Sequence, residues 1–464
     1  MNRFQPFWFD DAMSAEGREV RASLTKNITA DVCIVGGGYT GLWTAIKLRE
    51  KSPDLDIVII DKALCGQGAS GRNGGCMLTF SSKFRTLAEN VGIAEAIRLV
   101  KASESAVMAI DDFCQQQGID AEVRVHGALY TATNKAQQAI LQQPLAVLQQ
   151  QDINHWARLN SAKLAHFSGS SHHLAGIFTP YGGSVHPGKL VRGLAQVAQK
   201  MGIKIFENTA MLGFRSPGRV LIDTPRGCIS AGTLILATNA WTPQLIPQFK
   251  RAVVLVSSDM MITDVQPNTH NNPWFSQGTA VADSRLFVHY YRNSQSGRIM
   301  LGKGGNYFSY ANRMVPLFDQ ASRFEPMLSK AFADFFPDAD ATIARSWTGA
   351  SDRSVNGLPF FGHLPHQPNV LYGFGYSGNG VVQSFLGGEF LSSMALRLND
   401  EWTRSGMAGG VKQFFPPEPI CTLGARVIRR SVLRKEKCED EGRTAFWLDK
   451  KLAKLAVSAG KADK

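Results

Sequence analysis

Residues 31–41 read Asp31-Val-Cys-Ile-Val-Gly36-Gly-Gly38-Tyr-Thr-Gly41, an apolar run that ends in a glycine-rich turn. The residues that follow have the apolar spacing of a helix. Gly36 is expected to form the tight turn, Gly38 to let the backbone approach a pyrophosphate, and Gly41 to let helix and strand pack closely. The pattern predicts a strand, a turn and a helix whose N-terminus binds the phosphates of a dinucleotide.

The next apolar strand carries an acid at its end. It reads Asp56-Ile-Val-Ile-Ile-Asp61, and Asp61 follows the last glycine of the turn by about 20 residues, the distance typical of the carboxylate that binds the adenosine ribose. An acid at this point disfavours a 2′-phosphate. Glycine-rich turns also occur for purely structural reasons, but strand, helix and acid together favour a nucleotide-binding βαβ unit.

A second glycine-rich segment distinguishes between dinucleotides. It reads Gly66-Gln-Gly68-Ala-Ser-Gly71-Arg-Asn-Gly74-Gly75 and comes directly after the acidic strand end, where a nicotinamide-binding unit usually continues into its next helix. A second loop rich in backbone donors suits a longer cofactor with two ends. The sequence therefore predicts a flavin dinucleotide.

This segment resembles that of the glycine oxidase and D-amino-acid oxidase (DAO) superfamily of FAD-dependent oxidoreductases. The similar subgroups are the gamma-glutamylputrescine oxidase-like proteins and the aminophosphonate oxidoreductases, and the resemblance covers about residues 28–400. It implies an α/β fold with a Rossmann-type FAD-binding domain built on a parallel sheet. It also implies a substrate domain with a mixed or antiparallel β-sheet.

A third glycine-rich block, Gly373-Phe-Gly375-Tyr-Ser-Gly378-Asn-Gly380-Val-Val, precedes a helix of small residues. No acidic strand end follows, so a second nucleotide domain is not expected. In the resembled family such a block brings a helix N-terminus to the pyrimidine end of the flavin, where aligned amides stabilise the negative charge of the reduced ring.

The resemblance also implies which residues contact FAD. Two come from the Ala-Thr-Asn-Ala run at 237–240, and the others come from the three glycine-rich blocks and the acidic strand end. The expected set is Gly36, Gly38, Tyr39, Thr40, Gly41, Asp61, Lys62, Gly68, Ala69, Ser70, Arg72, Asn73, Gly74, Gly75, Thr238, Asn239, Gly375, Gly378, Asn379, Gly380 and Val381. A histidyl link to flavin is not expected in the second loop, and Cys76 is either near the ring or a buried thiol.

The remaining segments predict an interleaved organisation. Residues 28–118, 181–250 and 346–400 are assigned to the FAD-binding domain, 119–180 and 251–345 to the substrate domain, and 401–464 to a basic helical tail. The tyrosines of the second insert, Tyr290, Tyr291 and Tyr307, are expected either to line a pocket over the flavin or to build a core.

Two cationic residues are candidates for catalysis. Lys303, between glycines, lies at a strand end that faces the isoalloxazine in the resembled family, and would position substrate or activate oxygen; the alternative is a turn lysine in water. Arg353 would clamp a carboxylate or phosphonate, or else form an internal salt bridge with Asp352 or another acid. His186, beside Pro187 at a helix start, is expected to be structural.

Charge and composition restrict the partners. The net charge is +12, and residues 421–464 hold 12 Lys or Arg against 6 Asp or Glu. This basic amphipathic tail can lie on a membrane surface, dock on its own protein, or form a solvated face, which we favour. RNA-binding signatures and metal-site patterns were not found, so neither nucleic acid nor metal is expected. Seven scattered cysteines without a Cys-x-x-Cys pair favour a cytoplasmic address.

Together these features predict an FAD-dependent amine oxidoreductase. Hydride would pass from the carbon next to an amine to flavin N5, and the imine would hydrolyse to an aldehyde. The substrate would be a small amine with an anionic group, such as an aminophosphonate or a gamma-glutamyl polyamine, with O2 or a quinone as electron acceptor. The alternatives are a flavin-dependent RNA-modifying enzyme, which would use the positive charge, and a non-catalytic FAD-binding protein.

Overall fold

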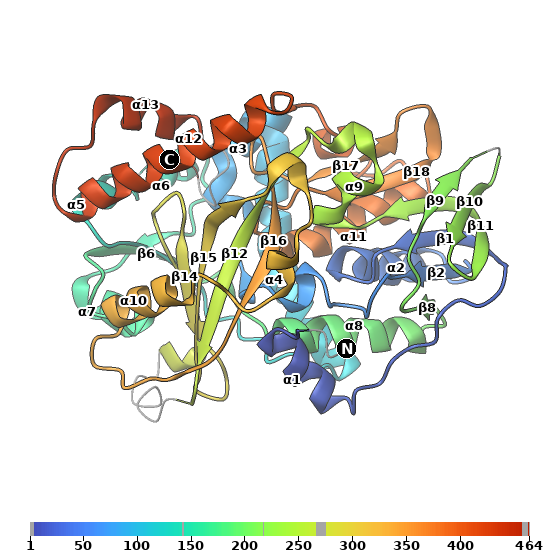
Figure 1. Ribbon diagram of the computed structural model, residues 1–464, viewed down its shortest axis with the longest axis horizontal. Coiled ribbons are helices and arrows are strands. Elements are labelled where there is room, and N and C mark those ends of the chain that lie inside the picture. Colours follow the sequence, from blue (N-terminus) through green and yellow to red (C-terminus); the bar gives the residue numbers. More distant parts are fainter. Residues whose placement is uncertain (1–3, 142, 217, 266–274, 457–462, 464) are drawn as a thin grey trace.

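The computed structural model describes residues 4–141, 143–216, 218–265, 275–456 and 463. Two large β-sheets lie side by side, with helices packed around the first (Figure 1). The first sheet has the order β17-β18-β11-β1-β2-β8, with β10 paired to β11 and β9 to β10. Its strands are β1 (Ile28–Val35), β2 (Ile57–Ile60), β8 (Lys204–Phe206), β9 (Gly213–Arg215), β10 (Val220–Thr224), β11 (Gly227–Leu236), β17 (Phe360–Leu364) and β18 (Gln367–Phe374).

The centre of this sheet is parallel. β1 pairs in parallel with both β2 and β11, β2 with β8, and β11 with β18. All four residues of β2 are buried, as expected for a strand covered on both faces, which reads as a continuous apolar run. The predicted parallel, Rossmann-type sheet is confirmed.

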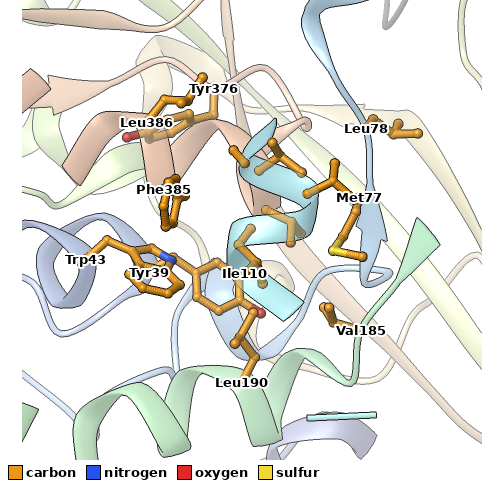
Figure 2. Packing of buried hydrophobic residues seen from close by; sticks show 14 of the residues in the cluster. Tyr39, Trp43, Met77, Leu78, Ile110, Val185, Leu190, Tyr376, Phe385 and Leu386 are labelled. Atoms are coloured by element: carbon orange, nitrogen blue, oxygen red, sulfur yellow. The ribbon is translucent and has the colours of Figure 1, made fainter. Parts of the chain in front are cut away.

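Helices from distant parts of the chain cover this sheet. α2 (Tyr39–Lys51), α8 (Pro187–Lys200) and α11 (Gly380–Ala395) pack on its strands. α4 (Ile93–Gln117) packs on α11, α3 (Phe84–Val91) on α4, and α1 (Phe7–Ala15) on α8, while the short helix α9 (Thr242–Leu245) follows β11. Trp43 of α2 contacts both Phe113 of α4 and Phe385 of α11, with ring centroids 4.9 Å apart in each case. Figure 2 shows Trp43 and Phe385 together in this cluster.

The second sheet has the order β16-β12-β15-β14-β13-β4-β6-β5 and is antiparallel except for the β13–β4 pair. Its strands are β4 (Ala128–Ala132), β5 (Ala157–Arg158), β6 (Ala175–Thr179), β12 (Val253–Thr263), β13 (Ala280–Asp283), β14 (His289–Asn293), β15 (Ile299–Phe308) and β16 (Ile343–Ser354). Helices α5 (Lys135–Ile140), α6 (Gln143–Gln150), α7 (Ser161–Ser168) and α10 (Glu325–Phe335) accompany it, and β3 (Cys76–Met77) pairs with β7 (Gly183–Ser184).

One expected boundary needs correction. The division between residues 345 and 346 falls inside β16, which pairs with β12 along its length up to Ser354. A strand held by a continuous ladder belongs to one sheet, so residues 346–354 belong to the second sheet. The other domain boundaries stay predictions.

The basic tail forms two helices, α12 (Ile420–Asp440) and α13 (Trp447–Lys454). One face of α12 docks on its own protein: the Glu436 carboxylate accepts the backbone N–H of Leu286 at 2.9 Å, and Arg429 donates to the carbonyl of Gly305 at 2.8 Å. Within the described ranges, every helix is too short or too polar to cross a membrane.

Candidate functional site

A cavity of about 660 Å³ lies where the carboxyl ends of β1 and β2 meet the second sheet. The first sheet contributes Gly36 and Asp61, which follow β1 and β2, and the second contributes Met260 of β12 and Tyr290 of β14. The carboxyl ends of parallel strands are where ligands bind in doubly wound α/β folds. The cavity is therefore the candidate site.

The first glycine turn has no room for side chains. Gly36 adopts φ +115°, and a Cβ there would lie 2.5 Å from the carbonyl oxygen of Ala237. A Cβ at Gly41 would collide with the carbonyl oxygen of Gly36, so this glycine permits the close contact of α2 with the turn. Gly36 and Gly38 line the cavity. Gly41 does not line it and instead lies where α2 packs against the turn.

Asp61 lines the cavity just beyond β2. One carboxylate oxygen accepts the backbone N–H of Gly37 at 2.8 Å, and the other accepts that of Ala63, also at 2.8 Å. Burial raises the pKa of Asp61, and these two N–H donors act in the opposite direction. The carboxylate is thus fixed at the rim of the glycine turn.

The second loop closes on itself and on the first turn. Asn73 accepts the backbone N–H of Gly75 through Oδ1 at 2.7 Å and donates through Nδ2 to the Ser70 carbonyl at 2.8 Å. The Ser70 hydroxyl accepts the N–H of Tyr39, the first residue of α2, at 2.9 Å. Arg292 of β14 donates to the Gly74 carbonyl at 2.7 Å, so the second sheet also holds this loop.

The third block is tied to the first turn and to a buried acid. Thr40 donates to the Tyr376 hydroxyl at 2.8 Å. The Asp352 carboxylate accepts the N–H of Gly375 at 2.6 Å, and burial raises the pKa of Asp352 to about 6. With its nitrogen toward this acid, the Asn239 amide donates to Asp352 at 2.7 Å. These bonds fix the loop before α11.

Arg353 presents a half-buried guanidinium to the cavity. Its Nη1 donates to the carbonyl of Ser377, and its other end lies against Gly304 and Gly378. Burial lowers the pKa of Arg353, while the neighbouring Asp352 raises it. Across the described residues, no carboxylate lies within ion-pair distance of Arg353, so the alternative of an internal salt bridge with Asp352 is not realised.

Lys303 does not lie at the site. It is buried, and its Nζ donates to the carbonyl of Phe287 at 2.8 Å. Gly302 of β15 pairs with Tyr290, whose ring lines the cavity, so Lys303 belongs to the opposite face, where it pairs with His289. The prediction of an active-site lysine is corrected on this geometry, as is the alternative of a turn lysine in water.

The expected tyrosines separate in the same way. Tyr290 lines the cavity, whereas its neighbour Tyr291 packs into the cluster around Phe335 and Phe336 on the other face. Tyr307 packs against Phe318 and does not line the cavity among the described residues. Successive strand residues point to opposite faces, which explains the division.

His186 is structural, as expected. It precedes α8, and its Nδ1 accepts the N–H of Lys189 at 3.1 Å, while Nε2 lies 3.1 Å from the Asp11 carboxylate. Burial lowers the pKa of His186, and the bond to Asp11 raises it.

Most of the residues expected from the sequence meet at this cavity. Those that line it are Gly36, Gly38, Tyr39, Thr40, Asp61, Lys62, Gly68, Ala69, Ser70, Arg72, Asn73, Gly74, Thr238, Asn239, Arg353, Gly378, Gly380 and Val381. The cavity lining does not include Gly41, Gly75, Gly375 and Asn379; a Cβ at Gly75 would meet the Val185 carbonyl, so this glycine permits close packing.

Other residues line the cavity that no sequence motif identified as ligand contacts. Trp241, whose ring lies 4.4 Å from Lys62 Nζ, and Met260 line the cavity. The rim formed by residues 314–316 and Phe318 also lines it. The sequence suggests Asp352 only as an ion-pair partner of Arg353. A βαβ fingerprint reports local backbone geometry, so it cannot identify side chains that arrive from another sheet.

The cavity fits FAD. Glycines replace side chains where the backbone must approach phosphates, a carboxylate stands where a ribose binds, and α11 begins beside the wall at Gly380. Such an arrangement suits a ligand with a pyrophosphate and a ring that gains negative charge.

Comparisons with known proteins agree with this geometry. The family model described as DAO, FAD dependent oxidoreductase, matches residues 31–394. An oxidoreductase named OrdL from Rhizobium meliloti is 30% identical over 80% of this chain and 84% of its own length. Gamma-glutamylputrescine oxidoreductase of Escherichia coli is 27% identical over 80% of this chain and 85% of its own.

A solved structure shows the same fold. Glycine oxidase from Geobacillus kaustophilus superimposes with a TM-score of 0.68 at 20% identity, covering 84% of this chain and all of that one. The family model covers residues 31–394, and this range holds the glycine turn, the acidic strand end and the strands that border the cavity. The chain belongs to the DAO family of FAD-dependent oxidoreductases.

Proposed function

We propose that this FAD-dependent amine oxidoreductase oxidises a small amine that carries an anionic group, such as an aminophosphonate or a gamma-glutamyl polyamine. Bound FAD supplies the hydride acceptor, N5, for the carbon next to the neutral amine. The substrate loses two electrons and becomes an imine, and water then releases an aldehyde and an amine or ammonia. The chain's own residues bind, orient and desolvate the substrate.

The observation that carries the proposal is Arg353. Its guanidinium lies half-buried in the cavity wall, is fixed at one nitrogen by the Ser377 carbonyl, and faces no carboxylate within ion-pair distance among the described residues. A cation that is partly removed from water is stabilised by an anion that pairs with it. A planar guanidinium matches a carboxylate or phosphonate, so a substrate with such a group would supply the missing partner.

The cavity wall around Arg353 suits the organic part of such a substrate. Tyr290 and Met260 contribute an aromatic ring and a thioether, and Ser258, whose hydroxyl lies 2.8 Å from that of Tyr290, contributes a polar group. Burial raises the pKa of Tyr290, so its phenol stays protonated. The wall thus offers apolar contacts and hydroxyl hydrogen bonds.

The electron acceptor is proposed to be O2 or a quinone. Peripheral contact of the basic tail with a membrane would favour the quinone. A cytoplasmic address is proposed from the cysteines, since no disulfide occurs among those that the structure describes.

The test is anaerobic bleaching of the oxidised flavin band. FAD-loaded protein is mixed with 2-aminoethylphosphonate, gamma-glutamylputrescine and, as a control amine without an anionic group, propylamine. Bleaching by an anionic amine with little by propylamine is expected. Arg353→Met should retain FAD and lose this preference, whereas Arg353→Lys should retain part of it. Absence of bleaching by any amine would overturn the proposal and favour a macromolecular substrate or a non-catalytic role.

A further inference from the structure

The tail carries an unusual concentration of exposed apolar side chains. α12 and α13 lie together at the upper left of Figure 1. Seven large apolar residues on or beside them are exposed, among them Trp447 at 62% and Leu455 at 67%. We call this set the tail face: Ile420, Leu423, Val427, Phe446, Trp447, Leu448 and Leu455. Exposed apolar side chains gathered on two packed helices are a candidate binding surface.

This face is held in place by its own scaffold. Ile420, Leu423 and Val427 follow the spacing of one helical stripe, while Val432, away from that stripe, is buried against the protein. Arg434 of α12 binds the Asp449 carboxylate of α13 with its closest N–O distance at 2.6 Å. The two helices are therefore held together as one unit.

Unpaired positive charge accompanies the apolar residues. Arg426 and Arg430 of α12 are exposed, as are Lys450, Lys451 and Lys454 of α13, and none has an ion-pair partner among the described residues. Apolar side chains on a helix with basic neighbours bind the interface of an anionic membrane. A second copy of the chain would bring like charges together, which opposes self-association through this face.

The start of α12 lies close to a segment that leads to the cavity. The N–H of Ala311 donates to Thr422 of α12 at 3.4 Å. Three and four residues further along the chain, Met314 and Val315 line the cavity. The segment that contacts the start of α12 is thus continuous with the wall of the site.

We propose that the tail face docks on an anionic lipid surface and thereby places the rim of the cavity beside the membrane. The docking is independent of the substrate. Only its consequence, access of a lipid-soluble quinone to the reduced cofactor, rests on the proposed function.

The test is flotation of FAD-loaded full-length protein with phosphatidylglycerol-containing vesicles and with pure phosphatidylcholine vesicles. Binding to the anionic vesicles is expected, falling with added salt. The double variant Leu423→Ser/Trp447→Ser should bind about tenfold more weakly or worse, because it removes the inserted side chains. Its control is Leu212→Ser, equally exposed but outside the tail.

A second pair of variants tests the charge. Arg430→Glu/Lys451→Glu should lower binding to anionic vesicles by about tenfold or more and hardly affect the neutral ones, while Arg226→Glu, exposed elsewhere, should change neither. Equal vesicle binding by all variants would overturn the proposal. So would a dimer that Trp447→Ser dissociates, because the face would then bind a second copy. Anaerobic bleaching without vesicles tests the amine chemistry separately.

Discussion

The hydroxyl of Ser70 accepts a hydrogen bond from the backbone N–H of Tyr39 at 2.9 Å, which joins the second glycine-rich loop to the first. The donor is one of the amides at the start of α2 that have no partner within the helix itself. A Cβ at Gly38 would lie 2.9 Å from the Ser70 hydroxyl oxygen. Helix N-termini leave such amides unpaired. One serine thus sets the distance between the two loops that border the cavity.

Removal of this hydroxyl should loosen the site without unfolding the protein. Ser70→Ala is expected to weaken FAD binding several-fold, because a hydrogen bond of this kind contributes about 1 kcal/mol. FAD affinity measured by fluorescence titration tests this, with Ser161→Ala, an exposed serine at the start of α7, as control. Unchanged affinity would show that the loops keep their distance without the bond.

Asp61 should matter more for FAD. Asp61→Ala removes the acceptor of two backbone N–H groups and the proposed ribose ligand, so FAD affinity should fall by at least about tenfold, given about 1.5–3 kcal/mol for hydrogen bonds to a charged group. Asp56→Ala, at the exposed start of the same segment, where Asp56 pairs with Lys204, is the control. A fully loaded Asp61→Ala variant would contradict the ribose assignment.

Lys303 should affect stability and not catalysis. Lys303→Met leaves the Phe287 carbonyl without its donor inside the second sheet, which costs about 1–3 kcal/mol in the free energy of unfolding. Stopped-flow reduction and reoxidation of the flavin should stay close to the wild-type rates. Slowing of either half-reaction in FAD-loaded variant protein would return this lysine to the site.

Asp352 should make stability depend on pH. Its pKa is raised to about 6 in the folded protein, so its neutral form is favoured there. Its contribution is complete below the unfolded pKa near 4 and is lost as pH rises through about 6, an effect of about 3 kcal/mol at most. Urea unfolding across this window should show a smaller fall in stability with rising pH for Asp352→Asn than for the wild type; an unchanged pH dependence would contradict this assignment.

Composition predicts only part of the structure of the C-terminal tail. Charge counts indicated a basic amphipathic segment, but only the folded chain divides it into a docked face, with Glu436 bonded to the backbone of Leu286, and the exposed tail face. Truncation at Pro416 would therefore remove contacts of the second sheet as well as positive charge.

The sequence by itself determined the dinucleotide turn, the acidic strand end and the parallel sheet, because these depend on short-range backbone geometry and on the spacing between Gly36 and Asp61. Tertiary structure alone decided which side chains enter the cavity. On β14, Tyr290 faces the site and Tyr291 faces away from it. On β15, Lys303 follows Gly302 and points away from the site to the opposite face of the sheet, where it is buried. Strand residues alternate between faces, so a shift of one position in register would exchange them, and register is set by long-range pairing.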